Sequence, residues 1–465
     1  MNAIISTAIS GLLMMFLGAF SSDKKAMKYI ASSLLIIDLS MSVLELISKT
    51  TLFNIDKKGL LLGTDSFSLT FISLILFCTL LYFLLSGSAI EKVGSQVAEY
   101  FALIFFILCG IGISATYKSL LMLFLGVEII SIPLYILTAS DKRNLKSNEA
   151  ALKYFLMGSF STGIMLLGIA FLYGGSTNAT FHIDQLNLGL GNFSSWMGLG
   201  LVFILISLAF KVSAAPFHFW TPDVYDGAPT VFTSFMSTIV KAAVFVAFIR
   251  LFEHSFGAIQ DQWQKLISFL IVATLFIGNI TAVFQQSVKR MLAYSSIAQA
   301  GFMLFAIFAL NAKAKEGLLL YSAAYSIATI GLFGILIKME DYTIDGFNGL
   351  AKRNPIMAVS ATVFLLSLTG VPLTAGFQSK FFMLMAAVDN GHQFWLVILA
   401  VLFAAVSAYY YFRVIQAMFF KEATTENQTG ELASNKFFEG MLVAMVVLTI
   451  IIGIYPEIII GWMYR

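Results

Sequence analysis

The chain has 465 residues, of which 59% are hydrophobic and 11% charged, and its mean hydropathy is +0.89. A soluble protein of this length could not bury so much apolar surface, so the composition excludes a soluble enzyme and predicts a polytopic protein embedded in a lipid bilayer. The formal net charge of +3 is small and gives no reason to expect a nucleic-acid partner.

Apolar segments of roughly 17–25 residues are typical of helices that cross a membrane. They predict an all-α integral membrane fold of about 14 spans in a single domain, residues 1–465. The polar stretches 174–196 and 421–436 are too short to fold alone. No basic region precedes the first span, which favours a retained membrane span over a cleaved signal peptide. The predicted spans cover residues 3–20, 29–48, 66–86, 98–113, 117–139, 148–173, 195–214, 226–252, 263–282, 289–309, 316–340, 355–386, 392–420 and 437–460.

Lysine and arginine are more frequent in the loops that follow odd-numbered spans than in those that follow even-numbered spans. Positively charged loops stay in the cytoplasm, so this bias predicts cytoplasmic odd-numbered loops and both termini on the outer, periplasmic side.

The seventh predicted span ends in a charge followed by a proline. Residues 197–210 carry no charge, Lys211 follows, and Pro216 comes five residues later. An ammonium at membrane depth costs ~2.5–3.5 kcal/mol, so an intramembrane lysine is a candidate functional residue. Pro216 removes a backbone donor, which is tolerated there only where protein or water satisfies the freed carbonyl. The alternative is that Lys211 reaches the membrane surface from the end of its helix.

Three further charges lie inside predicted spans: Glu128 in span 5, Lys241 in span 8 and Lys380 in span 12. Lys380 follows a second predicted break, at residues 370–374. Buried charges persist only when they are paired or hydrated, and four of them in separate spans favour a functional role over chance. The two breaks lie five spans apart, an odd number, so spans 4–8 and 9–13 are predicted to form inverted repeats.

The set of residues suggests proton transfer. A buried lysine binds its proton less tightly than an exposed one because desolvation disfavours the charged form, so it can load and unload a proton near neutral pH. Lys153 could partner Glu128, although reaching the cytoplasmic surface explains it almost as well. His218 titrates in a useful range, and a structural histidine lining the break is an equal alternative.

Other polar residues have weaker assignments. Asp38 and Glu45 share a face of span 2, and pairing with a neighbouring subunit is one interpretation. Cys78 and Cys109 are interpreted as small apolar core residues. No metal-ligand spacing, cofactor motif or redox motif is found, so no catalytic, metal or cofactor site is expected. Hydroxyl side chains could hold waters along a path: Ser213, Thr230, Thr233, Ser234 and Thr238. The histidines are His182, His218, His254 and His392.

Several segments together resemble a known family. The stretch 210–230, with its Lys-Val-Ser-Ala-Ala-Pro-Phe-His-Phe-Trp-Thr-Pro-Asp-Val-Tyr run, is similar to the subunit N family of respiratory complex I, the proton-translocating NADH-quinone oxidoreductase. That family belongs to the antiporter-like subunits shared with Mrp-type cation/proton antiporters. The resemblance continues through spans 4 to 13, at residues 123–134, 150–154, 289–296, 375–382 and 409–414.

The resemblance implies fourteen helices, two inverted five-helix repeats and broken helices 7 and 12. The N-terminal spans would occupy residues 1–97, the repeats 98–252 and 263–420, and the last span 437–460. It also implies a coupled pair of Glu128 and Lys211, an auxiliary Lys153, a connecting Lys241 and a distal Lys380. One departure is Gln299, where relatives often have histidine; an amide cannot relay protons by titrating, but it can bind water.

The function implied is that of a membrane-arm subunit that moves protons while electrons pass to quinone in other subunits. FMN, iron–sulfur clusters and quinone are therefore expected outside this chain, with subunits A, J and K on one side and subunit M on the other. A bacterial inner membrane is the expected location. The alternatives are a subunit of a multi-subunit Na⁺/H⁺ antiporter and a non-conducting spacer of the membrane arm.

Overall fold

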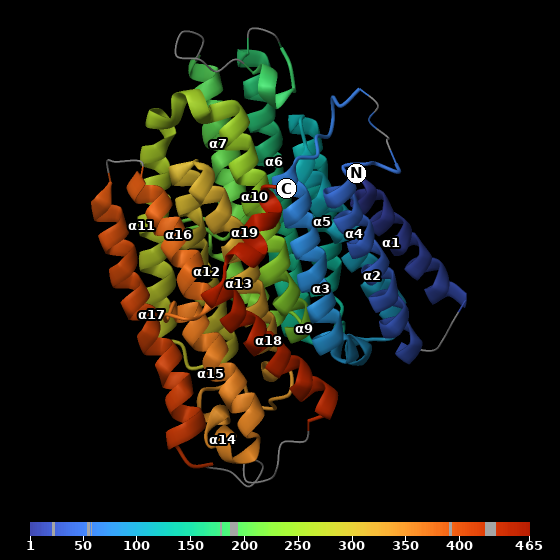
Figure 1. Ribbon diagram of the computed structural model, residues 1–465, viewed down its shortest axis with the longest axis vertical. Helices are drawn as coiled ribbons and strands as arrows, with labels where there is room; N and C mark the ends of the chain where they lie inside the picture. Colours follow the sequence, from blue (N-terminus) through green and yellow to red (C-terminus); the bar gives the residue numbers. More distant parts are fainter. Residues whose placement is uncertain are drawn as a thin grey trace.

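The computed structural model describes residues 1–20, 24–53, 56, 58–176, 179–186, 194–389, 393–423 and 434–465. Within these ranges the fold is an elongated bundle of helices (Figure 1). Both termini lie toward the same end of the bundle, and α14 lies at the other end. The helices are α1 (Asn2–Phe20), α2 (Lys24–Ser48), α3 (Ser66–Val93), α4 (Val97–Thr116), α5 (Leu120–Thr138), α6 (Leu145–Gly175), α7 (Ser195–Lys211), α8 (Trp220–Gly227), α9 (Thr230–Phe235), α10 (Lys241–Leu251), α11 (Gln260–Val283), α12 (Val288–Ala309), α13 (Ala312–Leu336), α14 (Leu350–Arg353), α15 (Pro355–Thr369), α16 (Ala375–Asp389), α17 (Phe394–Phe420), α18 (Lys436–Ile454) and α19 (Glu457–Met463).

The predicted all-α membrane fold is confirmed. By length and hydropathy, eleven helical runs among the described residues could cross a membrane, and one of them, Thr230–Val283, contains α9, α10 and α11. The shorter apolar helices α7 and α15 are the first halves of the two broken spans. The number of fourteen spans stays a prediction.

Both predicted breaks are present. α7 ends at Lys211 and α8 begins at Trp220, while α15 ends at Thr369 and α16 begins at Ala375. Gly370 closes α15 with φ +92°, a left-handed conformation that a residue with a Cβ adopts only at a cost.

One predicted boundary is wrong. Span 8 was expected from residue 226, but α8 ends at Gly227 and the next helix begins at Thr230. Pro229 explains the interruption, because proline has no N–H to donate and pushes the preceding Ala228 into an extended conformation with ψ 152°. A π-helical turn, Met236–Val240, then separates α9 from α10, and a second π-helical turn, Phe252–Phe256, follows α10.

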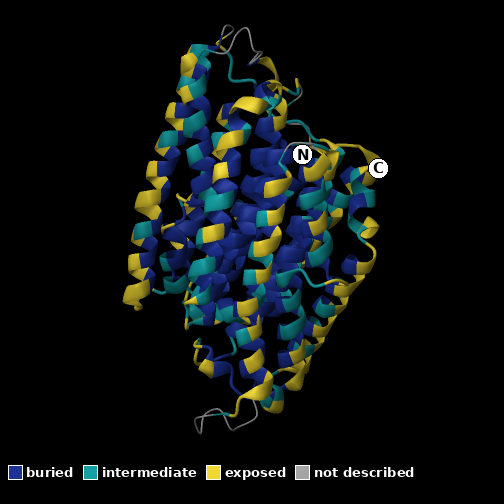
Figure 2. Ribbon diagram, turned by 90° about the vertical axis from the view of Figure 1, so that its left-hand side faces the viewer, coloured by how far each residue is buried: buried dark blue, intermediate teal, exposed yellow. Residues whose placement is uncertain are grey.

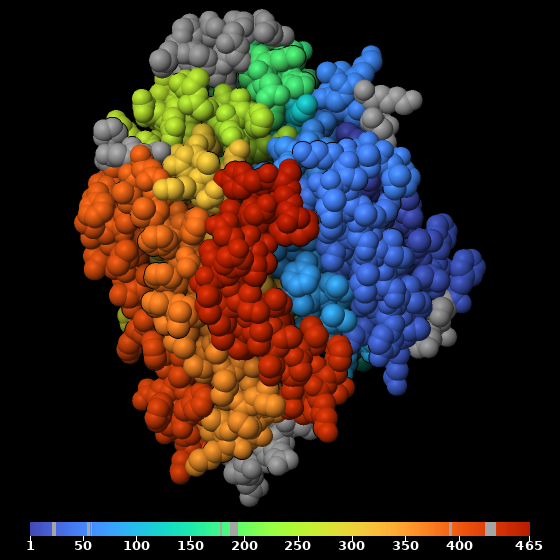
Figure 3. Space-filling model, viewed as in Figure 1, coloured from blue at the N-terminus to red at the C-terminus, as the bar shows by residue number. Residues whose placement is uncertain are grey.

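The centre of the bundle consists of α10, α12 and α13, whose residues are buried almost throughout. The exposed residues lie on the outer faces of the peripheral helices (Figure 2), where apolar side chains would meet lipid. On one face, the C-terminal α18 and α19 lie beside α3 (Figure 3), so the last helices close against the N-terminal part of the chain.

Arg250, near the end of α10, ties the central helices to a loop. Its guanidinium donates to the carbonyl oxygens of Tyr117, at 2.9 Å, and Gly63, at 3.1 Å. It also pairs with Asp65 at 3.0 Å. Asp65 caps α3 by accepting from the backbone N–H of Ser68, and Tyr117 directly follows α4, so a single guanidinium joins the start of α3 and the end of α4 to the core.

Candidate functional site

The break after α7 places Lys211 at a helix end inside the bundle. Beyond it, the indole nitrogen of Trp220 donates to the carbonyl oxygen of Phe210 at 3.0 Å, and Ala215 donates its N–H to Thr274 at 2.9 Å. The peptide bond between Ala215 and Pro216 is cis. Side chains and neighbouring helices thus satisfy backbone groups that an unbroken helix would pair.

The Lys211 ammonium points at α5. It donates to the Ser131 hydroxyl at 2.8 Å and lies 3.5 Å from the hydroxyl of Tyr135. Glu128 precedes Ser131 by three residues, so both lie on the same side of α5. Glu128 and Lys211 form no ion pair, and one carboxylate oxygen of Glu128 has no hydrogen-bonding partner among the described residues. Ser131 therefore lies on the same side of α5 as Glu128 and accepts a hydrogen bond from Lys211.

Tyr225 and Ser213 are further polar residues near the lysines. Ser213 follows Lys211 by two residues and adopts a left-handed conformation with φ 65°. Its hydroxyl is buried and has no hydrogen-bonding partner among the described residues. The Tyr225 ring lies 5.9 Å from the Lys241 ammonium, so a phenol that can donate and accept lies beside that lysine.

Lys241 begins α10 directly after the π-helical turn, and only 2% of its surface is exposed. Its ammonium donates to the carbonyl oxygen of Ser296 at 2.9 Å and to the Ser296 hydroxyl. Single π-helical turns within α-helices are frequent at functional sites. The wide turn sets the direction in which Lys241 projects, toward α12.

Gln299 continues the connection along α12, one turn beyond Ser296. Its amide nitrogen donates to the Leu368 carbonyl at 3.0 Å and to the Tyr411 hydroxyl at 3.2 Å. Its amide oxygen accepts a hydrogen bond from Tyr321. Both the nitrogen and the oxygen of the Gln299 amide are therefore hydrogen-bonded to protein groups. The sequence did not predict this for a position where relatives often have histidine.

Lys380 ends the series at the second break. Its ammonium donates to the carbonyl oxygens of Leu368, at 2.7 Å, and Thr369, at 2.9 Å, which close α15. The same ammonium lies 4.5 Å from the Phe302 ring. The carbonyl end of a helix carries partial negative charge, so α15 stabilises a cation there.

We call this series the polar axis. Its residues come from α5, α7, α8, α10, α12, α15 and α16 and from the segment between α7 and α8. They are Glu128, Ser131, Lys211, Ser213, Tyr225, Lys241, Ser296, Gln299, Leu368 and Lys380.

Lys153 does not pair with Glu128. Its ammonium pairs instead with Glu149 and Asp223, each at 2.8 Å, and its side chain is 41% exposed. Lys153 lies on the third turn of α6, close to the bundle end, where acidic partners and solvent are available. The surface alternative describes Lys153 better than the pairing with Glu128.

His218 lies within the first break and is buried against the ring of Phe219. Its Nδ1 has no hydrogen-bonding partner among the described residues. No hydrogen bond between side chains joins it to Lys211, so it lies beside the polar axis and outside the series of contacts.

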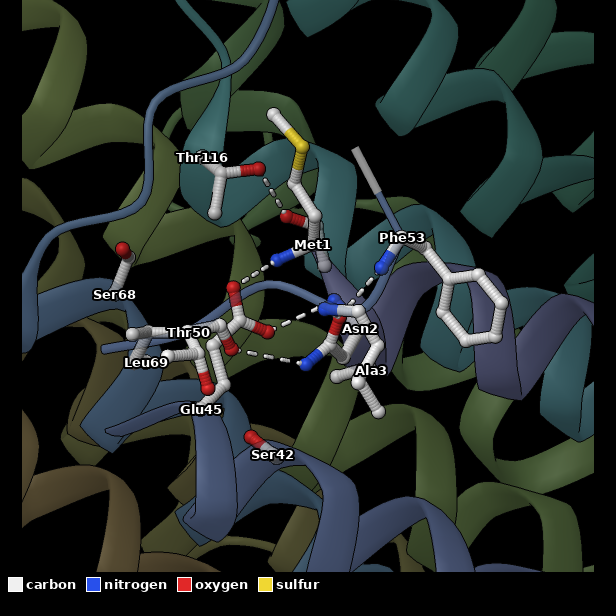
Figure 4. A network of polar contacts seen from close by, with 12 residues as sticks. Met1, Asn2, Ala3, Ser42, Glu45, Thr50, Phe53, Ser68, Leu69 and Thr116 are labelled. Atoms are coloured by element: carbon white, nitrogen blue, oxygen red, sulfur yellow. Dashed lines mark hydrogen bonds and ion pairs between the residues drawn. The ribbon is translucent and has the colours of Figure 1, made fainter. Parts of the chain in front are cut away.

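The interpretation of Asp38 and Glu45 as partners of a neighbouring subunit is wrong, because both are buried against α1 of the same chain. Asp38 accepts a hydrogen bond from Ser10 at 3.2 Å. Glu45 accepts from the amino group of Met1 at 2.6 Å and from the N–H of Asn2 at 2.8 Å (Figure 4). These acids tie α1 to α2.

Among the described residues, no group of three or more His, Cys, Asp or Glu side chains could hold a metal ion. His392 lies outside the described residues. Cys78 is buried and Cys109 half-buried, and both are free thiols.

Comparison with known proteins places these features in a family. The family described as NADH:quinone oxidoreductase/Mrp antiporter, TM, matches residues 118–407, which include every residue of the polar axis. NADH-quinone oxidoreductase subunit N of Cytophaga hutchinsonii is 37% identical over 464 residues, covering 99% of each chain. The subunit of the same name from Trichlorobacter lovleyi is 39% identical over 407 residues, covering 85% of this chain and 82% of the relative.

Solved structures give the same picture. A chain of respiratory complex I from Thermus thermophilus superposes with a TM-score of 0.83 at 29% identity, covering 99% of this chain and 98% of the other. A chain of the Mrp complex from a Dietzia species has a TM-score of 0.85 at 19% identity, covering 99% and 96%. The second likeness concerns the fold alone.

Proposed function

This chain belongs to the NADH:quinone oxidoreductase/Mrp antiporter transmembrane family, and from that membership we propose that it is subunit N of an NADH-quinone oxidoreductase. In this role it is an antiporter-like subunit of a proton-translocating enzyme, carried in the membrane arm of the complex. It moves protons through the polar axis while quinone is reduced in other subunits.

The observation that carries the proposal is the series of buried lysines along the polar axis. Ser213, two residues after Lys211, has a buried hydroxyl without a partner among the described residues, and the Tyr225 ring lies 5.9 Å from the Lys241 ammonium. Lys241 is bonded to Ser296, and Gln299, one turn further along α12, shares the Leu368 carbonyl with Lys380. Ser131 and Ser296, whose hydroxyls can both donate and accept, bind Lys211 and Lys241, and the Leu368 carbonyl, which only accepts, links Gln299 to Lys380.

The chemistry follows from charge repulsion in a medium of low dielectric. A proton on Lys211 disfavours a second proton on Lys241, because two ammonium ions in one apolar interior repel strongly. Glu128 favours the proton on Lys211. A charge that changes beside Glu128 would therefore shift proton occupancy along the axis toward Lys380, and the hydroxyl and amide groups would orient the waters that carry the proton.

The proposal also assigns the neighbouring subunits, the cofactors of the other subunits and the membrane in which the complex lies. Subunits A, J and K would lie on one side and subunit M on the other, with FMN, iron–sulfur clusters and quinone in the remaining subunits. The location would be a bacterial inner membrane, with both termini on the periplasmic side. No redox chemistry is expected in this chain.

Replacing Lys211 or Lys241 with alanine tests the proposal in membrane vesicles that contain the whole complex. We expect the complex to assemble and proton translocation driven by quinone reduction to fall roughly tenfold or more, the scale of losing a positioned proton-transfer group. Lys352→Ala, at a position whose side chain is 80% exposed on α14, is the control. Undiminished translocation in both axis variants would support a non-conducting spacer.

Purification of the complex separates the second alternative. Iron–sulfur subunits that purify with this chain support the NADH-quinone oxidoreductase. Small antiporter subunits without iron–sulfur proteins would contradict it and support a Na⁺/H⁺ antiporter.

A further inference from the structure

Lys289 is a buried lysine that lies outside the polar axis. It is the second residue of α12, and only 4% of its surface is exposed. Its ammonium donates to the carbonyl oxygens of Asp226, at 2.9 Å, and Ala228, at 2.8 Å, and lies 5.7 Å from the Tyr342 ring. It forms no ion pair with a described acid, so a costly buried cation is held by carbonyl groups alone.

On one side of Lys289 lies a charged cleft. The cleft has a volume of about 230 Å³ and opens to the exterior between α6, α8 and α12. Asp226 connects the cleft to Lys289, because it lines the cleft and its backbone carbonyl oxygen accepts a hydrogen bond from Lys289. Lys289 therefore lies directly behind the cleft wall. The cleft is lined by Lys146, Glu149, Lys153, Asp223, Asp226 and Arg290.

On the other side of Lys289 begins a row of hydroxyl groups. The Ala228 carbonyl that binds Lys289 also accepts a hydrogen bond from Thr233, at 3.5 Å. Thr233, Ser237 and Lys241 follow at four-residue intervals across the π-helical turn Met236–Val240. The Thr233 hydroxyl donates to the Tyr225 carbonyl at 3.0 Å and the Ser237 hydroxyl to the Ser234 carbonyl at 3.1 Å, so both would have to rotate to pass a proton on. The hydroxyl oxygen of the neighbouring Ser234 is buried and has no partner among the described residues, so this stretch holds hydrogen-bonding capacity that the protein does not use.

We propose that Lys289 is the proton-uptake group through which protons pass from the charged cleft to Lys241. This inference rests on the proposed function. A hydronium ion in the cleft transfers its proton to the neutral amine of Lys289, forming an N–H bond and leaving water. The resulting ammonium gives one proton to the hydroxyl row, where each group accepts a proton and releases its own, and the last proton binds the neutral amine of Lys241. No electron moves.

The cleft lies at the end of the bundle where the charge bias predicts the cytoplasm. Lys146 is the second residue of α6, directly after the loop that follows span 5, and Tyr342, which packs on Lys289, is in the loop after span 11. Both loops follow odd-numbered spans, and the charge bias predicts that such loops are cytoplasmic. The uptake route would then draw protons from the cytoplasmic side and deliver them to the middle of the polar axis, without passing Glu128.

A substitution that keeps the charge separates this role from a structural one. Arginine can bind the same carbonyl oxygens but stays protonated, so it cannot pass a proton on. In membrane vesicles with the whole complex, we expect Lys289→Arg to assemble and to lower the rate of proton translocation roughly tenfold, with Lys352→Arg as the control for the same charge-conserving change at an exposed position. Translocation at the parent rate in Lys289→Arg would overturn the proposal.

A second pair of variants decides the matter if arginine prevents assembly. Thr233→Val removes the hydroxyl while keeping the shape, and Thr233→Ser restores it, so we expect translocation to fall severalfold in the first and to recover in the second. Equal rates in the two variants would overturn the proposal. Lys211→Ala distinguishes failure of the uptake route from failure of the proposed function. If Lys211→Ala abolishes translocation while the Lys289 and Thr233 variants do not, only the uptake route through Lys289 is contradicted.

Discussion

The clearest quantitative prediction concerns Gln299, which holds the polar axis together between Ser296 and Lys380. Replacing it with leucine keeps the approximate volume of the side chain but removes a buried amide with three hydrogen bonds. The groups that lose a partner are the Leu368 carbonyl and the hydroxyls of Tyr411 and Tyr321.

The cost of the substitution follows from what each partner does next. The Leu368 carbonyl still accepts from Lys380, and the Tyr411 hydroxyl still bonds to Ser295. The Tyr321 hydroxyl has no other hydrogen bond among the described residues. One unsatisfied buried hydroxyl and two lost hydrogen bonds give a destabilisation of about 2–4 kcal/mol.

Replacing Tyr321 with phenylalanine in the same chain removes the unsatisfied hydroxyl. The double variant Gln299→Leu/Tyr321→Phe should therefore recover about 1–2 kcal/mol of stability, because removing both partners is cheaper than removing one. Proton translocation should stay low in both variants, since the polar axis is interrupted in each.

Denaturant titration of the purified complex in detergent, followed by loss of this subunit, measures the stability of the parent and of both variants. Vesicle assays measure translocation in parallel. The reasoning is refuted if Gln299→Leu is as stable as the parent, or if the double variant is less stable than the single one.

Three further predictions concern the ends of the bundle. Arg250→Met should lower stability by about 2–4 kcal/mol, measured by thermal unfolding, because two carbonyl bonds and one partly solvent-screened ion pair are lost; an unchanged midpoint would contradict this. Desolvation raises the pKa of Asp65, but Arg250 and the hydrogen bonds of Ser68 outweigh it and hold the pKa below its usual 3.8. Asp65 therefore stabilises the fold above that value and loses this effect as the pH falls below it, so unfolding midpoints measured across this range should fall less steeply in Arg250→Met than in the parent. Lys153→Gln should leave the unfolding midpoint nearly unchanged, since its pairs with Glu149 and Asp223 are half exposed; a clear fall of the midpoint in the same thermal assay would refute the surface assignment.

Much of the fold was predictable because a bilayer imposes simple rules on sequence. A helix must be long and apolar to cross it, and breaks are tolerated only where other groups satisfy the backbone, which is why Pro216 and the Gly370 region marked the two discontinuities correctly. The interruption at Pro229 was missed because the apolar run continues through it. The π-helical turns leave no compositional sign, so the sequence could not locate them.

The lysines of the candidate site were predictable from the sequence, but their hydrogen-bonding partners were not. Buried charges such as Lys211, Lys241 and Lys380 stand out in an apolar sequence, because each costs free energy to insert. Their partners are serine, tyrosine and backbone carbonyl groups, which also occur throughout ordinary helix packing and therefore carry no signal alone. Lys289 was visible only as part of a family resemblance, because it lies at a helix end where lysine usually reaches solvent.

The π-helical turn before Lys241 makes the geometry of the site sensitive to chain length. Such a turn holds one residue more than the α-helical path it replaces. Deleting one residue within 236–240 would allow a regular helix and rotate Lys241 by about 100°, away from Ser296, without altering any side chain of the polar axis. A single-residue deletion in this turn would thus abolish the bond between Lys241 and Ser296 in one step.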